Sequence, residues 1–237
     1  MRTKKIILLT TICLLVSSFY GYAQKAQAFK FAGFDKVEVS HAMTLYLEPT
    51  GKNTAMVVGD EDLLKLLEVK EEGGKVIFRI KKKSFWNFMD NNKGSLRIYL
   101  SYKNISTLDA SGASHIYMKD DATFTSGLLK LDCSGASGIK LNLDVENLEC
   151  DLSGASRATF SGNASNVLLD ASGASHFSAK ELNVQNANID VSGASHISVT
   201  VKKSIKGEAS GASSINYYGN PPHSSVSSSG ASSIRRK

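Results

Sequence analysis

Six acidic residues recur at one position of an internal repeat, and their type and spacing could support binding chemistry. Each lies two residues before a Ser-Gly-Ala-Ser motif: Asp109, Asp132, Asp151, Asp170, Asp190 and Glu208. If neighbouring repeats pair as strands about 4.8 Å apart, these carboxylates form a column. Two such charges repel by about 1 kcal/mol in water, and by more near a protein surface. We interpret the column first as solvated carboxylates that accept hydrogen bonds from turn amides. Weak Ca²⁺ binding and a basic partner are the alternatives.

The repeat itself organises most of the chain. The motif starts at Ser111, Ser134, Ser153, Ser172, Ser192, Ser210 and Ser229, in steps of 18 to 23 residues. Such a period is too short for a pair of helices and is typical of one turn of a β-solenoid.

The residues that flank the motif alternate in polarity. Apolar residues predominate three residues before it, one residue before it, and five residues after its first serine. A period of two indicates strands with one face toward a core. We therefore predict an all-β fold: a right-handed parallel β-helix with turns of about 19 residues and an irregular N-terminal cap.

Two geometries for the motif stay open. If the alternation continues through it, its glycine and second serine point inward, and stacked serine hydroxyls satisfy one another. If the glycine is a corner, the alanine packs inward instead. In both cases the motif is a tight structural element.

The N-terminal region, residues 24–104, lacks the motif. Alternating residues predict strands at 37–39, 43–47, 76–80 and 96–100, with a hairpin turn at 72–74. Asp60 and the leucines that follow predict a short helix at 60–67. We interpret this region as the first irregular turns and the cap of a solenoid at 105–237.

The first 23 residues are typical of an export signal. Positive residues precede the apolar run from Ile6 to Val16, which is too short for a stable membrane anchor. We place cleavage after Ala23, which leaves no integral membrane segment. Cleavage removes three positive charges and lowers the net charge from +6 to +3. No dense basic stripe remains, so nucleic-acid binding is not expected.

Cys133 and Cys150 remain in the mature chain. Both occupy inward positions of neighbouring repeats, offset by two residues. Strand geometry then places their Cα atoms about 8 Å apart, beyond the usual reach of a disulfide. We predict two buried thiols.

Two other groups are candidates for binding. A second outward column is expected at His115, Gly138, Arg157, His176, His196, Ser214 and Ser233, and we interpret it as a surface column rather than a metal site. Trp86 lies in an aromatic segment with Phe85, Phe88 and Met89. An exposed segment of this kind would suit contact with a glycan or a protein, and a hydrophobic plug on the first turn is the simpler interpretation.

No catalytic constellation stands out from the repeats. The outward polar residues are the repeated ones, and we find no nucleophile motif and no Cys/His metal signature. We therefore predict an exported, non-catalytic binding module, with a glycan or protein as its partner. A structural or assembly module of the periplasm is the main alternative, and a polysaccharide-active enzyme is a weaker one.

Three segments carry a resemblance to a known family. They are Phe34-Asp35-Lys36-Val37-Glu38-Val39, Gly59-Asp60 with Leu63-Leu64, and Leu108-Asp109-Ala110-Ser111-Gly112-Ala113-Ser114. Over about residues 30–235 the chain resembles the putative auto-transporter adhesin, head GIN domain family of Bacteroidota envelope proteins. The resemblance implies a parallel β-helix in the periplasm, at the outer-membrane surface or outside the cell. It supplies no catalytic residues.

Overall fold

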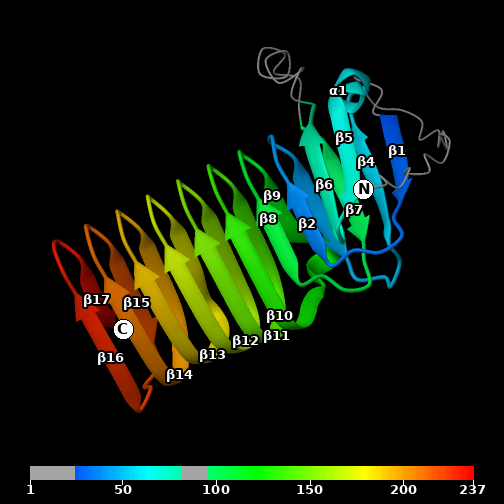
Figure 1. The fold of residues 1–237 in the computed structure, drawn as a ribbon. Helices are drawn as coiled ribbons and strands as arrows, with labels where there is room; N and C mark the ends of the chain where they lie inside the picture. The colour runs from blue at the N-terminus through cyan, green and yellow to red at the C-terminus, as the bar shows by residue number, and fades with distance from the viewer. Residues whose placement is uncertain (1–24, 82–94) are drawn as a thin grey trace.

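The computed structural model describes residues 25–81 and 95–237 and has an almost entirely all-β fold, with one short α-helix (Figure 1). The repeat region forms a parallel solenoid. Its elements are β8 (Thr107–Ala110), β9 (His115–Met118), the short 3₁₀ turn η2 (Lys119–Asp121), β10 (Thr123–Cys133), β11 (Gly138–Leu152), β12 (Arg157–Ala171), β13 (His176–Val191), β14 (His196–Ala209), β15 (Ser214–Tyr218), β16 (His223–Ser228) and β17 (Ser233–Arg236).

Each long strand runs from one motif to the next and pairs with its copies in the neighbouring turns. Asp151 on β11, for example, lies beside Asp132 on β10 and Asp170 on β12. All pairings among β8–β17 are parallel. The predicted parallel β-solenoid is confirmed, and its right-handed sense stays a prediction.

The N-terminal elements are β1 (Lys25–Lys30), β2 (Lys36–Val39), β3 (Thr44–Glu48), β4 (Thr54–Gly59), α1 (Glu61–Leu66), β5 (Leu67–Glu72), β6 (Lys75–Ile80) and β7 (Arg97–Ser101). Four of these strands, the hairpin turn and the helix match the expectation from sequence, whereas β1, β4 and β5 were not predicted. The side chain of Asp60 caps α1 by accepting a hydrogen bond from the Asp62 amide. Gly73 and Gly74 form the turn between β5 and β6.

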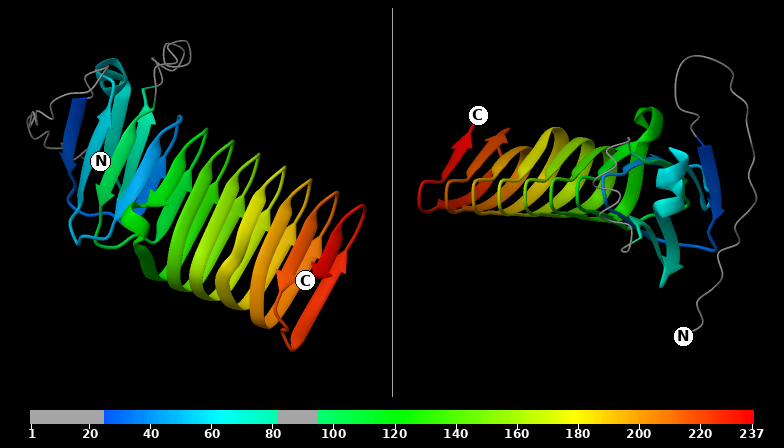
Figure 2. Two further views of the ribbon diagram at one scale, coloured as in Figure 1. Left: turned by 180° about the vertical axis from the view of Figure 1, so that it is seen from behind. Right: turned by 90° about the horizontal axis from the view of Figure 1, so that it is seen from above.

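In the first turns of the solenoid, strands that are neighbours in space are not neighbours in sequence. Strands β2 and β3 pair in parallel with β8 and β9 on one side, and with β6 and β7 on the other. Beyond them, β1 and β4 extend the sheet in antiparallel fashion from β7, and β5 does so from β6 (Figure 2). These antiparallel strands occupy the N-terminal end of the parallel stack. The domain boundary placed at residue 104 stays a prediction.

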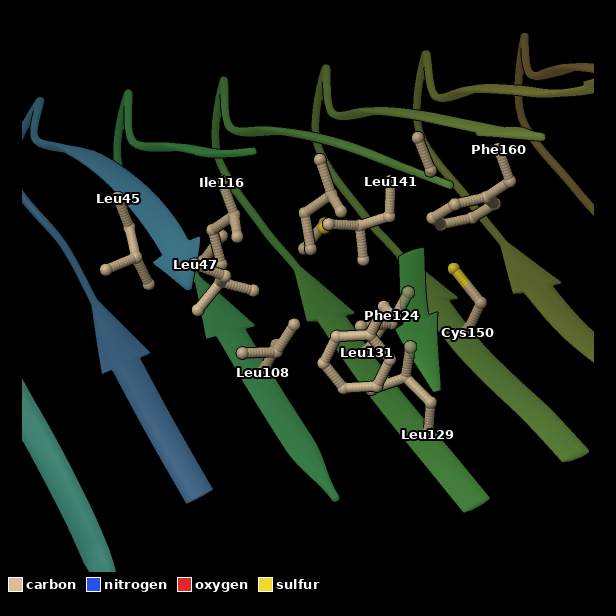
Figure 3. Packing of buried hydrophobic residues seen from close by; sticks show 14 of the residues in the cluster. Leu45, Leu47, Leu108, Ile116, Phe124, Leu129, Leu131, Leu141, Cys150 and Phe160 are labelled. Carbon is tan, nitrogen blue, oxygen red and sulfur yellow. The ribbon is translucent and has the colours of Figure 1, made fainter. Parts of the chain in front are cut away.

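The core is a thin apolar layer between the two sheet faces. Side chains from successive turns stack on one another, as Leu108 and Leu131 do on one face and Leu141 and Phe160 on the other (Figure 3). The predicted inward positions are buried through the turn of β14. The last turn differs, because Val226 is 42% exposed and Ser228 is also exposed.

The Ser-Gly-Ala-Ser corner combines features of both geometries considered from sequence. Its glycine is an exposed corner with φ between 69° and 73° in all seven copies, so the expectation that it points inward is wrong. Its alanine is exposed, which contradicts the alternative in which alanine packs inward. The second serine is buried in the first six copies, as the continued alternation predicts.

Two of the six buried serines bond within their own corner, whereas the hydroxyls of Ser114 and Ser137 have no hydrogen-bond partner among the described residues. The hydroxyl of Ser175 donates to the Ser172 carbonyl at 2.7 Å, and that of Ser213 donates to the Ser210 carbonyl at 2.8 Å. Between turns, the hydroxyls of Ser156 and Ser175 lie 3.4 Å apart. The continuous serine ladder that we expected is therefore not formed, and a local turn replaces it at Ser175 and Ser213.

Both cysteines are free and buried, as predicted. Burial raises the pKa of the Cys133 thiol to about 12 and that of Cys150 well above its ordinary value. We expect neither thiol to react with a maleimide in the folded protein at mildly alkaline pH, and both to react in urea. A Ser225→Cys variant, whose thiol would be exposed, is the positive control. Rapid labelling of the folded wild-type chain would contradict the prediction.

Candidate functional site

The six predicted carboxylates form one continuous column. Asp109, Asp132, Asp151, Asp170, Asp190 and Glu208 are paired in register from β8 to β14, and Glu38 on β2 extends the column beyond Asp109. The aspartates from 132 to 190 are exposed and line a shallow groove with Ser153, Ser172 and Ser192. The structure therefore brings together all six residues that the repeat predicted.

A lysine from outside the repeat neutralises one end of this column. Lys75 donates to Asp109 at 3.0 Å and to Glu38 at 3.1 Å, and these hydrogen bonds raise the pKa of the lysine. At the other end, Lys206 lies 3.3 Å from Glu208. Sequence analysis missed Lys75 because its position depends on β6 pairing with β2.

The next two carboxylates along the column, those of Asp132 and Asp151, have raised pKa values. Burial, and then the charge of Asp109, raises the pKa of Asp132. Burial, and then the charge of Asp132, raises the pKa of Asp151. The ionised column therefore costs stability at these two positions.

We expect Asp151→Asn to stabilise the fold at neutral pH by about 0.2–1 kcal/mol, the range of exposed charge interactions. A folded-state pKa above the unfolded value of 3.8 means that ionisation opposes folding. The cost of ionising Asp151 is therefore present in full when the pH is above both its folded-state and its unfolded-state pKa. It disappears as the pH falls through the raised folded-state pKa to below 3.8. Urea unfolding of both proteins at neutral and acid pH measures the difference.

The matched control is Asp144→Asn, which removes a charge from the same strand outside the column. Equal stabilisation by both variants would show that net charge, rather than the column, is responsible.

Weak Ca²⁺ binding at the column stays a prediction. Among residues 25–81 and 95–237, no group of three or more His, Cys, Asp or Glu side chains is placed to hold a metal ion. Titration calorimetry should show heat at millimolar Ca²⁺ that is lost in Asp151→Asn, and its absence in the wild type would contradict the prediction.

The second predicted column is also in register, from His115 through Ser233. The rings of His176 and His196 stack with centroids 6.5 Å apart. Burial, followed by the charges of Arg157 and His196, lowers the pKa of His176. The neutral form of the His176 ring is therefore favoured beside the Arg157 charge.

A row of tyrosines on the same sheet was not expected from sequence. Tyr46 stacks on Tyr99 at 5.2 Å and lies 5.9 Å from Tyr117. Tyr117 in turn stacks on His115 at 6.1 Å, and the Lys119 ammonium lies 5.9 Å from the Tyr99 ring centroid. Because these neighbours occupy the ring faces, the row offers mainly ring edges to a partner.

A second missed feature is a ladder of asparagines at the corner opposite the motifs. Asn166 donates to Asn147 and Asn186 donates to Asn166, each at 3.0 Å, and Ser204 donates to Asn186 at 2.8 Å. These residues lie on the wall of a groove of about 1010 Å³ that spans β10 to β16. The four ladder residues each lie six residues before a Ser-Gly-Ala-Ser motif. Their shared repeat position is the sequence signal that could have revealed the ladder.

The last predicted site residue, Trp86, lies outside the described residues, as do Phe85, Phe88 and Met89. The export signal at residues 1–23 also lies outside them.

Comparison with known proteins decides the family. The family model for the putative auto-transporter adhesin, head GIN domain, matches residues 33–221, which is most of the chain. The chain belongs to this family. The resemblance seen in the sequence is thereby confirmed. No curated protein matches this GIN-domain chain.

Solved structures share the fold of the GIN-domain chain. A putative adhesin from Bacteroides fragilis is 18% identical, with a TM-score of 0.79, and the alignment covers 92% of this chain and 98% of that one. A putative lipid binding protein from Parabacteroides distasonis is 17% identical, with a TM-score of 0.69 and coverage of 90% and 96%. At these identities the likeness establishes the fold alone.

Among the described parts of the GIN-domain chain, no helix has the length and apolar character needed to cross a membrane.

Proposed function

We propose that the chain is exported and acts in the cell envelope as a non-catalytic binding module of the adhesin type. The observation that carries the proposal is the register of the solenoid. It places the same outward groups on successive turns, as in the column from Asp109 to Glu208. A surface of repeated groups suits a partner that is itself extended or repetitive.

The non-catalytic part rests on the arrangement of the polar residues. Catalysis needs a local cluster of different groups at fixed geometry. From β8 to β17 the outward polar side chains belong mainly to columns that repeat from turn to turn. The names of the family and of its solved neighbours, adhesin and lipid binding protein, also describe binders.

Export rests on the first 23 residues, with their positive start, apolar run and small residues before Gln24. The proposed locations are the periplasm, the outer-membrane surface and the extracellular space. Adhesion requires one of the last two.

Protease accessibility on intact cells tests the proposal. We expect the folded protein to be reached by an added protease or antibody without opening the outer membrane. The internal control is a periplasmic protein that the protease reaches only after the outer membrane of the same cells has been permeabilised. If this chain behaves like the control, adhesion is contradicted and a periplasmic assembly role replaces it.

Two further measurements separate the remaining classes. Saturable binding to an array of glycans and matrix proteins would support the binding module. Release of reducing ends from any polysaccharide in the array would overturn the non-catalytic assignment.

A further inference from the structure

The groove of about 1010 Å³ beside the asparagine ladder, which we call the asparagine groove, is lined by outward side chains of successive turns. One wall is the ladder of Asn147, Asn166, Asn186 and Ser204, paired in register across β11 to β14. The other wall lies two residues further along each strand and is formed by Glu149, Leu168, Asn188 and Lys206. The groove therefore runs across the strands, along the solenoid axis.

The ladder leaves hydrogen-bonding capacity unused. A primary amide has two N–H donors and an oxygen with two lone pairs. Asn166 uses one N–H toward Asn147 and accepts one bond from Asn186. Within the described residues, its second N–H donates to no protein group. The same holds for Asn186, whose one N–H bond goes to Asn166, so successive turns offer the same free donor about 4.8 Å apart.

The other wall supplies apolar contact. Leu168 is 44% exposed, and it is one of three large apolar side chains with such exposure in the described chain. Leu128 also lines the groove, and buried side chains such as Val167 form its floor. Amide donors beside an exposed leucine match a ligand with both hydroxyl groups and C–H surfaces.

The charges at the groove are compensated by the protein. Glu149 lies 2.5 Å from Lys130, and Lys206 lies 3.3 Å from Glu208. The groove therefore gives little net attraction to an ionic ligand. From β11 to β14 its backbone groups are also engaged in the parallel ladders, so an extended peptide has no free strand edge along this part of the groove.

We infer that a neutral, linear polysaccharide binds along the asparagine groove, with its chain parallel to the solenoid axis. The hydroxyls of successive sugars accept hydrogen bonds from Asn147, Asn166 and Asn186, and a sugar face packs on Leu168. This inference rests on the proposed binding function and names both its site and its ligand class.

Titration calorimetry with soluble β-1,4-linked glucose and N-acetylglucosamine oligomers tests it, with polygalacturonate as the acidic comparison. We expect the neutral oligomers to bind, and their affinity to rise with length until the chain fills the groove. Leu168→Ser should weaken binding about tenfold, the equivalent of 1.4 kcal/mol. Asn188→Ala, which truncates an exposed side chain on the same wall, should weaken it less.

Thr159→Ala is the matched control, because Thr159 lies on the same strand as Leu168 but on the opposite sheet. It should bind as the wild type does. Unchanged melting temperatures in all three variants would exclude loss of folding as the cause.

Three outcomes would overturn the inference. Neutral oligomers that bind Leu168→Ser and wild type equally would place their site elsewhere, and binding of polygalacturonate alone would contradict the ligand class. In the third outcome, no oligomer binds, the protein is accessible on intact cells, and the array detects a protein ligand. The groove inference then fails, and the proposed function stands.

Discussion

Gly173→Val should destabilise the solenoid by about 2–5 kcal/mol, the sum of a left-handed backbone cost and an overpacking cost. Gly173 has φ +73°, and a Cβ there would lie 2.5 Å from the carbonyl oxygen of Gly154 in the preceding turn. That oxygen cannot move away easily, because it accepts a 2.7 Å hydrogen bond from the Ala174 amide. The expected fall in melting temperature is about 5–15 °C.

Three alanine variants separate the causes. Gly51 has φ +75° but no atom within 4 Å of a built Cβ, so Gly51→Ala reports the backbone cost alone, about 1–2 kcal/mol. Gly127 has neither a positive φ nor a close neighbour, so Gly127→Ala should be nearly neutral. Gly173→Ala should exceed Gly51→Ala. A melting temperature for Gly173→Val equal to that of wild type would refute this account of the corner.

Phe177→Ala is expected to cost about 3–5 kcal/mol, as for other buried aromatic truncations. Phe177 is fully buried, and its ring contacts that of Phe160 with centroids 5.6 Å apart. Its neighbour in register on β12 is Ala158, which is too small to fill the space that the ring would leave. Chemical unfolding should show the loss, and Phe177→Leu should recover a large part of it.

Hydrogen exchange can locate the damage from Phe177→Ala. Because each turn contacts mainly its neighbours, protection should fall most in β12, β13 and β14. Uniform loss of protection from β2 to β17 would show instead that the solenoid unfolds as a single unit.

The repeat region was predictable because two independent regularities agree there. The alternation shows which residues point inward, and the motif spacing shows which residues are neighbours across turns. Together they placed Asp132 beside Asp151 and buried Cys133 and Cys150. The same reasoning fails at Val226 and Ser228, because no following turn covers them among the described residues.

The N-terminal region was predictable only element by element. Alternation revealed β2, β3, β6 and β7 but not β1, β4 and β5, and no repeat indicates that β2 lies between β6 and β8. The features that depend on this arrangement, Lys75 beside Asp109 and Tyr46 between Tyr99 and Tyr117, were therefore missed. The asparagine ladder was missed for a different reason: Asn147, Asn166 and Asn186 share one repeat position, but it lies six residues before the motif and outside the flanking positions whose alternation defined the strands.

The two buried thiols make the timing of folding matter in an oxidising compartment. In the unfolded chain, Cys133 and Cys150 are 17 residues apart, and their sulfurs can meet freely. In the folded chain, Cys150 lies opposite Leu131 instead, which places the two Cα atoms about 8 Å apart, too far for a disulfide. An oxidant that arrives before these two turns pair would therefore close a bond that blocks the native register, whereas one that arrives later finds both sulfurs covered. A chain exported as proposed must complete this part of its solenoid faster than its thiols are oxidised.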